Sequence, residues 1–214
     1  MAYLALETFL KEVLPYCPDL AEHVAVNAIR NSCMEFSRLT TIHRMDIAPI
    51  DGVATQSEYT IVVPVETQLA TPIKIYYSGI ELKPRSEELL VAQYKYQDWT
   101  TITGQPAFFT QLNPGTIKIV PYPSVNYTGA ITGRISLMPT RAAMNVYDDL
   151  YNRYSEEIAL GARSRLHYTP GQPYFDPNMA EQCKQKFMDA IGATKARANQ
   201  GQTRSVSRVL YNKF

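Results

Sequence analysis

The sequence predicts an α+β protein with a helical bundle body, an inserted antiparallel β-rich domain and an extended C-terminal arm. Two changes in composition predict this order. Residues 1–40 and 141–200 show helical periodicity and hold prolines only at Pro15, at Pro18 and in the turn region 168–177. Residues 41–140 are rich in Pro, Thr, Val, Ile and Tyr, and residues 201–214 follow neither pattern. We therefore expect a discontinuous body (1–40 and 141–200), an insertion (41–140) and an arm (201–214).

The first part of the body is predicted to hold two helices. A short one spans about Leu4 to Leu14 and ends at Pro15, because the residue before a proline is disfavoured in the helical region. Apolar residues at helical spacing predict a second helix from about Leu20 to Leu39. Asp19 with Glu22 resembles a capping box at its start.

The insertion is predicted to consist of short strands. Asp51-Gly52 is a hairpin signal, and an alternating run before Ser78-Gly79 predicts a strand that ends in a tight turn. The strands are expected at Tyr59–Val65, Ile73–Tyr77, Ala107–Gln111, Ile117–Val120 and Ala130–Met138. Ser86–Lys95 is the exception and predicts one or two helical turns.

Helical periodicity returns in the second part of the body. Asn145 is the expected cap of a helix that continues to Leu166, in which Gly161 would permit a close helix contact. Asp176-Pro177 predicts the start of a last helix, with Asp as the cap and Pro in the first turn, and this helix should end near Asn199.

Charge and composition exclude several classes of protein. Lys and Arg number 21 and Asp and Glu number 20, so the net charge of +1 is far from that of a dedicated nucleic-acid binder. The three cysteines form no CxxC pair, and no apolar run approaches the length of a membrane span. The N-terminus lacks the basic leader of a secretory signal. We expect a soluble protein made in a reducing cytoplasm.

No catalytic, cofactor or metal site is predicted. Cys17 with His23, or Cys33 with His43, has no local signature of a nucleophile and its base, and the separated Cys and His residues do not suit a zinc site. Neighbouring carboxylates on a helix point about 100° apart and do not converge on one substrate. Phosphate-binding and hydrolase motifs are missing from the sequence. We expect that the chain is not an enzyme.

The aromatic residues of the insertion have two interpretations. Tyr94, Tyr96 and Trp99, near Lys95, could stack on single-stranded nucleic acid. At a net charge close to zero, packing or subunit contact is the favoured interpretation.

The last fourteen residues, 201–214, hold basic and apolar side chains and no acidic residue. Their pattern has no amphipathic period. It is typical of an arm that orders on a partner, although a solvated terminus is the alternative.

Several segments, taken in order along the chain, resemble one family. They are C-P-D-L-A-E (17–22), N-S-C-M-E-F-S (31–37), the Asp51-Gly52 pair with Tyr59, G-Q-P-A-F-F (104–109), I-K-I-V-P-Y-P (117–123), S-L-M-P-T (136–140) and Y-x-x-x-I-A-x-G-A-x-x-R-L (154–166). This series resembles the head-to-tail adaptor, or connector, proteins of tailed bacteriophages.

The resemblance implies a structural virion protein without catalysis or cofactors, assembled in the bacterial host cytoplasm and located at the head–tail interface. It implies a homo-oligomeric ring of 12 copies on the portal, a channel through which duplex DNA passes without sequence-specific contact, and a platform for tail or nozzle proteins. The arm would reach the portal protein. Its expected portal-binding residues are Arg204, Arg208, Leu210, Tyr211, Lys213 and Phe214.

Two other functions stay open at the level of the sequence. One is a different minor virion protein that completes the tail or the head. The other is a nucleic-acid-binding module, which the charge balance disfavours.

Overall fold

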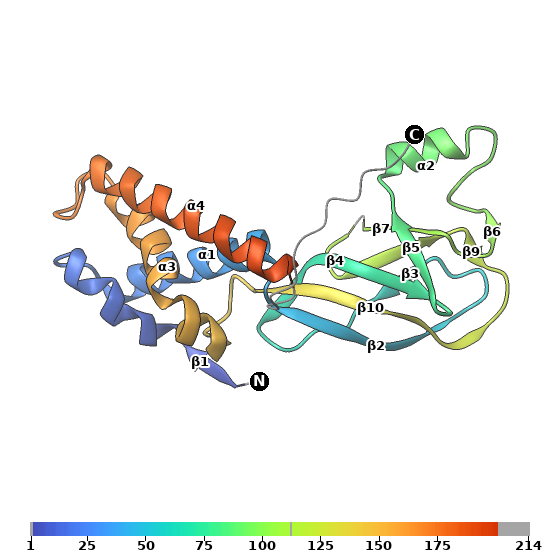
Figure 1. Ribbon diagram of the computed structural model, residues 1–214, viewed down its shortest axis with the longest axis horizontal. Helices are drawn as coiled ribbons and strands as arrows, with labels where there is room; N and C mark the ends of the chain where they lie inside the picture. The colour runs from blue at the N-terminus through green and yellow to red at the C-terminus, as the bar shows by residue number, and fades with distance from the viewer. Residues whose placement is uncertain (1, 112, 201–214) are drawn as a thin grey trace. The chain divides into compact units, whose positions relative to one another are not determined.

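A computed structural model describes residues 2–111 and 113–200 and confirms the mixed α+β class (Figure 1). The described chain forms two compact units. One contains residues 2–42 and 139–200 and is helical, and the other contains residues 43–138 and is built on a β-sheet. The portal-binding arm expected at 201–214 lies outside the described residues.

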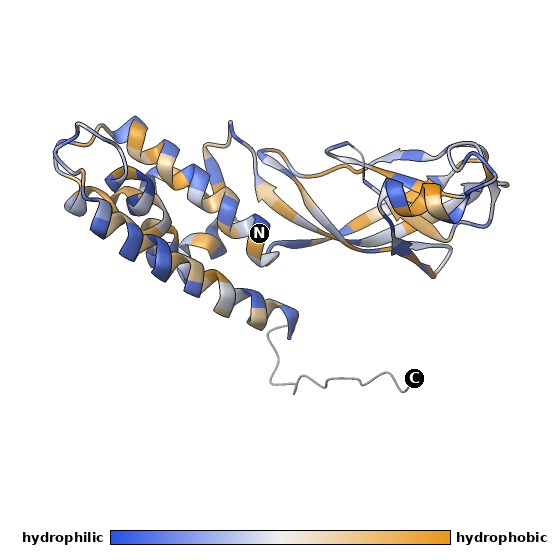
Figure 2. Cartoon of the chain, turned by 90° about the horizontal axis from the view of Figure 1, so that it is seen from above, coloured by the Kyte–Doolittle hydropathy of each residue, from blue (hydrophilic) through white to orange (hydrophobic). Residues whose placement is uncertain are grey.

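The helical unit is formed by segments from the two ends of the described chain. Its elements are β1 (Tyr3–Ala5), the 3₁₀ helices η1 (Leu6–Glu12) and η2 (Leu14–Tyr16), α1 (Glu22–Thr40), β11 (Asn145–Tyr147), α3 (Asp148–His167) and α4 (Pro177–Asn199). Helix α3 packs against both α1 and α4. Hydrophobic and hydrophilic residues are interleaved along the long helices (Figure 2), which is the pattern of helices that bury one face.

The core of this unit combines residues from η1, α1, α3 and α4. Phe9 of η1, Phe36 of α1 and Ile158 of α3 are fully buried, and Phe187 of α4 is 3% exposed. The Phe36 ring lies 5.1 Å from that of Tyr154 and 6.1 Å from that of Phe187. The core needs segments from both parts of the unit, because the Phe36 ring of the first part packs against Tyr154 and Phe187 of the second.

The predicted start of α4 is confirmed. The Asp176 carboxylate accepts hydrogen bonds from the backbone N–H groups of Asn178 and Met179, and Pro177 occupies the first turn, where no backbone donor is needed.

Two other predicted caps are wrong. The N-cap of α1 is Ala21, and Asp19 lies two residues earlier with a left-handed φ of 60°. Asn145 does not cap α3, because it belongs to β11 and pairs with Ala5 of β1. In each case the polar residue stands close to the helix start, but the backbone before the helix takes a course that local sequence does not specify.

The helix predicted at Leu4–Leu14 is confirmed only in part, because Leu6–Glu12 is helical but of the 3₁₀ type. Tyr3–Ala5 forms a strand with β11, where the rings of Tyr3 and Tyr147 stack at 5.0 Å, and the chain then continues as two 3₁₀ helices. Pro15 lies inside η2 rather than ending a helix. The pairing of β1 with β11 draws the first residues into an extended form that helical periodicity alone would not predict.

The sheet unit is built on seven strands in the order β2-β10-β4-β5-β7-β8-β3, which form a nearly closed sheet. Its elements are β2 (Arg44–Gly52), β3 (Glu58–Thr60), β4 (Thr67–Tyr77), β5 (Ile80–Pro84), α2 (Glu87–Gln93), β6 (Thr103–Gly104), β7 (Phe108–Thr110), β8 (Thr116–Val120), β9 (Tyr122–Pro123) and β10 (Tyr127–Pro139). Strands β5 and β7 pair in parallel, as do β6 and β9, so the expectation of a wholly antiparallel region is wrong.

Local turn chemistry in this unit follows the sequence. Ser78 and Gly79, at φ 48° and 81°, join β4 to β5 in an antiparallel pair, as predicted. The side chain of Ser86 caps α2 by accepting a hydrogen bond from the N–H of Leu89. Strands β7, β8 and β10 lie within or around their predicted ranges.

The predicted hairpin at Asp51-Gly52 is wrong. These residues end β2, whose partner is the distant β10, with Gly52 opposite Tyr127. The strand expected at Tyr59–Val65 is shortened to β3, Glu58–Thr60, and pairs with β8. A turn signal was present, but a long-range pairing decided where the strand lies.

Gly161 lies at a close contact of α3 with α4 and α1, as predicted. A Cβ atom built on Gly161 would lie 2.9 Å from two ring carbons of Phe187 on α4 and 3.0 Å from Oγ of Ser32 on α1. The Phe187 ring is 3% exposed, so a side chain at Gly161 would have to displace this ring or push α3 away from its neighbours.

We predict that Gly161→Ala lowers the free energy of unfolding by about 1–2 kcal/mol, because overpacking outweighs the roughly 1 kcal/mol that Ala gains over Gly in a helix. Gly192→Ala on α4 is the matched control, since nothing lies within 4 Å of a Cβ at that position. It should raise stability by up to about 1 kcal/mol. Urea unfolding followed by circular dichroism measures both, and equal stabilisation by the two variants would contradict the packing described for Gly161.

Candidate interaction site

All six residues predicted to bind the portal lie in 201–214 and therefore outside the described residues. The structure does describe the end of the body from which this segment continues. Helix α4 ends at Asn199, and Gln200 follows as its C-cap. The residues around Gln200 are therefore the part of the candidate site whose contacts the structure describes.

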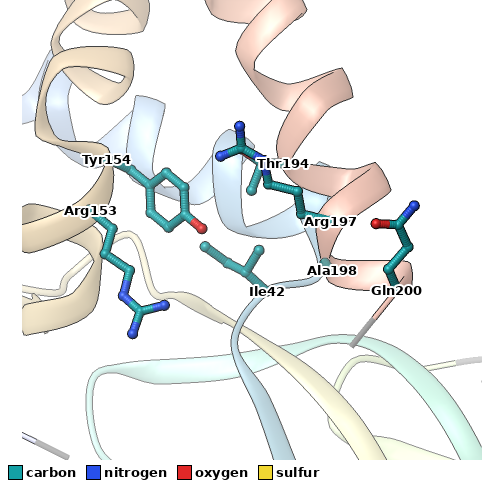
Figure 3. Close-up of a pocket in the computed structure, with 7 residues that line it drawn as sticks. All are labelled: Ile42, Arg153, Tyr154, Thr194, Arg197, Ala198 and Gln200. Carbon is teal, nitrogen blue, oxygen red and sulfur yellow. The ribbon is translucent and has the colours of Figure 1, made fainter. Parts of the chain in front are cut away.

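A cavity of about 330 Å³ lies at this end of α4, within the helical unit. It is lined by Ile42, Arg153, Tyr154, Thr194, Arg197, Ala198 and Gln200. Arg153 and Tyr154 come from α3, whereas the other polar residues come from α4 and its cap (Figure 3).

A break in α3 places two of these side chains. Tyr154 has φ −138° and ψ 22°, outside the helical region, so the first turns of α3 are set at an angle to the rest. The ring of Tyr154 packs on Phe36 in the core, which fixes its position. Figure 3 shows its hydroxyl group and the side chain of Ile42 directed toward the centre of the cavity.

The polar groups of the cavity are mostly hydrogen-bond donors. Arg153 and Arg197 are exposed and bring two guanidinium groups, one from each helix. Arg153 pairs with Asp149, one turn earlier, at 3.5 Å, and both side chains are more than half exposed, so this pair contributes little to stability. Within the described residues, the side chains of Arg197 and Thr194 and the Tyr154 hydroxyl group make no side-chain hydrogen bond or ion pair.

The lining combines basic, polar and apolar side chains. Two arginines, the phenol of Tyr154 and the buried residue Thr194 lie beside the apolar side chains of Ile42 and Ala198. Figure 3 shows the guanidinium groups of Arg153 and Arg197 directed away from each other, on opposite sides of the Tyr154 ring. The cavity therefore holds two basic side chains whose charged groups do not meet at one point.

The cysteine residues do not contribute reactive groups to it. Cys17, Cys33 and Cys183 are free and buried. Desolvation raises the pKa of Cys17 to about 11 and also raises those of Cys33 and Cys183. The structure thus agrees with their interpretation as core thiols, since the thiolate is the nucleophilic form.

The aromatic cluster of the insertion is chiefly a packing feature. Trp99 is 6% exposed and packs with Leu90 and Val120, while Lys118 lies 4.9 Å from the centre of its ring. Tyr94 packs against the same cluster, whereas Tyr96 is 91% exposed. The packing interpretation is confirmed for Trp99 and Tyr94, whose rings are not free to stack on bases.

Neither a metal site nor a membrane span is found in the described part of the chain. No group of three or more Cys, His, Asp or Glu side chains there could hold a metal ion. None of the helices described there combines the length and the apolar character that crossing a bilayer requires.

Comparison with protein families gives one match, to the model of the SU10 adaptor protein, over residues 1–209. The chain belongs to the SU10 adaptor protein family. This is a family of phage head-to-tail adaptors, so the resemblance stated from the sequence is confirmed. A search of curated proteins found no match.

Membership places the chain among structural proteins of the virion at the head–tail junction and implies contact with phage portal and tail components. The match extends nine residues into the predicted arm and includes Arg204 and Arg208.

Sequence reasoning did not find the cavity. None of the four polar residues contributed by the two helices, Arg153, Tyr154, Thr194 and Arg197, is predicted from the sequence as part of a site. The break in α3 and the convergence of two helix ends are tertiary features. The one available signal is a basic residue near the start of one predicted helix, Arg153, and another near the end of the last helix, Arg197.

We predict that a disulfide-type thiol reagent at about pH 8 labels none of the three cysteines in the folded protein and all of them in denaturant, because both burial and a raised pKa suppress the thiolate. Absorbance of the released thiol reports the reaction. Rapid labelling of Cys17 or Cys183 without denaturant would contradict their placement in the core.

Proposed function

We propose that this chain is the head-to-tail adaptor of a tailed phage, forming a ring beneath the portal, extending the DNA channel and providing the docking platform for the tail. The observation that carries the proposal is the family match over residues 1–209, because it covers both units and the start of the arm together. The protein acts by binding and has no catalytic step or cofactor.

We also propose that the parts of the chain have different roles. The helical unit acts as the body and supplies the contacts between neighbouring copies, with the sheet unit inserted into it. Residues 201–214 act as the arm. Fourteen residues at about 3.3 Å each span at most roughly 46 Å, enough to leave the body and follow the surface of a portal subunit.

The charge distribution supports a protein partner for the arm. Residues 1–200 hold 18 basic and 20 acidic side chains, whereas residues 201–214 hold Arg204, Arg208 and Lys213 and no acidic residue. The basic side chains would pair with portal carboxylates, and Leu210, Tyr211 and Phe214 would fill apolar pockets. Burial of apolar residues combined with ion pairs gives both affinity and register.

The same distribution argues against a protein that holds DNA tightly. A ring of 12 copies around a channel must let the duplex slide, and each strong phosphate contact would oppose that movement. A body with a small excess of acidic residues suits the passage of duplex DNA better than tight binding of it.

We predict that deleting residues 201–214 abolishes binding to the purified portal while leaving the circular dichroism spectrum and unfolding midpoint unchanged. A chain in which these residues are replaced by a Gly/Ser segment of equal length is the matched control for length and should also fail to bind. Surface plasmon resonance on immobilised portal measures both. Binding of the truncated chain at wild-type affinity would place the portal contact elsewhere.

We predict that the free chain stays monomeric at micromolar concentration and forms rings only when portal is added. Its exposed large apolar side chains, within the described residues, are spread over both units, and scattered single residues of this kind are normal on a monomer. Light scattering gives the mass of the free chain, and electron microscopy shows the ring on the portal. Stable dodecamers without portal would exclude a templating role for the portal.

A further inference from the structure

We propose that the sheet units of neighbouring copies are joined by inserting an apolar loop of one copy into an uncharged groove of the next. The valine loop comprises residues 61–66, with the sequence I-V-V-P-V-E, and precedes β4. The tyrosine groove lies where β4 ends. This inference rests on the proposed function, because it names a contact between the copies of the ring. It adds to the contacts proposed for the helical unit.

The valine loop presents two aliphatic side chains to solvent. Val62 is 82% exposed and Val65 is 86% exposed, more than any other valine, leucine or isoleucine among the described residues. Single exposed apolar residues are normal on a protein surface. These two share one short loop, and the sequence from Tyr59 to Val65 carries no charge. The loop is therefore a small apolar projection that the described part of the chain does not cover.

The valine loop is held in shape at both ends. Ile61 is buried, and its N–H donates to the carbonyl group of Gly115 at 2.9 Å. The hydroxyl group and the N–H of Thr67 both donate to the carbonyl group of Pro64, at 2.6 and 3.2 Å. The ring of Pro64 restricts the backbone further. The loop therefore loses little conformational freedom when it binds, which favours its use as a contact.

The tyrosine groove is a hollow of about 290 Å³ within the sheet unit, and no charged side chain lines it. Its apolar and aromatic lining residues are Tyr77, Ile80, Pro106, Pro123, Val125 and Tyr127, and the others are Ser, Gly and Gln. The ring of the buried Tyr77 stands edge-on to that of Tyr127, with centroids 6.4 Å apart. Ile80, Val125 and Tyr127 are about half exposed. The groove therefore offers an apolar surface that is open to solvent.

The lining of the groove favours an uncharged apolar segment of protein. Grooves lined by aromatic rings bind extended, proline-containing segments in several classes of protein. A phosphate or a carboxylate would lose its hydration without gaining a basic partner, because no Lys or Arg lines the groove. The volume lies at the lower end of the range for ligand pockets, which suits one or two side chains of a loop. The valine loop has this chemistry.

A copy cannot fill the groove with its own valine loop. Thr67, directly after the loop, begins β4, whereas Tyr77, in the groove, ends it. The eleven residues of this strand span roughly 33 Å, and the loop is fixed at both of its ends. Each copy therefore carries one loop and one groove that only another molecule can cover.

Two unlike surfaces on each copy are what a ring requires. A contact between unlike surfaces repeats from copy to copy and closes into a ring when the rotation allows it. A loop of this size buries far less than the roughly 1,200–2,000 Å² of a stable interface. The contact is therefore weak by itself, which agrees with the prediction that the free chain stays monomeric until the portal brings copies together.

The test is cross-linking of engineered cysteines in the full-length chain assembled on the purified portal. The variant Val65→Cys/Val125→Cys carries one thiol on the loop and one at the groove, and a short bismaleimide joins thiols that meet. The native cysteines are buried and do not compete. We expect a ladder of covalent trimers and larger products on a denaturing gel, whereas Val65→Cys alone and Val125→Cys alone give no ladder. Val65→Cys/Val91→Cys is the matched control, since Val91 is as exposed as Val125 but does not line the groove.

A third substitution tests the chemistry of the contact. Adding Val62→Asp to the cross-linking variant should lower the yield of the ladder by about tenfold, because a carboxylate would have to enter an uncharged groove. Adding Val62→Ile keeps the loop apolar and should leave the yield within about twofold. Unfolding midpoints should stay unchanged, since Val62 is exposed. A ladder that Val62→Asp does not weaken would overturn the inference.

Separate outcomes decide the inference and the proposed function. If rings form on the portal without the ladder, or if the Val91 control gives an equal ladder, the inference is wrong and the adaptor function stands. Products that stop at dimers would also overturn it, because they indicate a reciprocal pair, and so would cross-links to portal or tail protein in place of the ladder. If wild type does not bind the portal, the proposed function fails. Cross-linking of the concentrated free chain then decides the inference, which a ladder supports and its absence overturns.

Discussion

The helical unit depends on the close contact of α1, α3 and α4 at Gly161. With no side chain at this position, the Phe187 ring and Ser32 Oγ come within 3.0 Å of where a Cβ would stand. This contact determines how the start of α3 and the end of α4 lie relative to each other. Arg153 lies eight residues before Gly161 and Arg197 ten residues after Phe187, roughly 12–15 Å along each helix. The two arginines can line one cavity only if the helices stay in contact at this point and run in opposite directions.

Local chemistry explains the elements that the sequence predicts well. Asp176-Pro177 starts α4 and Ser86 starts α2, because each cap satisfies backbone donors a few residues away. Ser78-Gly79 closes a hairpin because both residues take positive φ values. In these three cases the signal and the structure it specifies lie within a few residues of each other. Gly161 differs, because the glycine is visible in the sequence but its partners Phe187 and Ser32 lie on other helices.

The errors have a common physical cause, which is competition from distant segments. Asp51-Gly52 looks like a hairpin, but the pairing of Gly52 with Tyr127, 75 residues away, makes it the end of a long strand. Asn145 looks like a cap but joins a strand with Ala5. The cavity is missed for the same reason, because the break at Tyr154 and the position of Arg197 beside α3 arise from packing. Sequence reasoning could find the family through the order of its segments, yet it could not find a site assembled from two helices.

The family match and the basic, acid-free composition of residues 201–214 are the grounds on which we propose that the chain binds the portal through its C-terminal segment. A cryo-electron microscopy reconstruction of the chain bound to its portal tests this most directly. The account predicts a ring beneath the portal, with residues 201–214 lying against portal subunits. A ring that meets the portal through its sheet units, with residues 201–214 making no contact with it, would contradict the account.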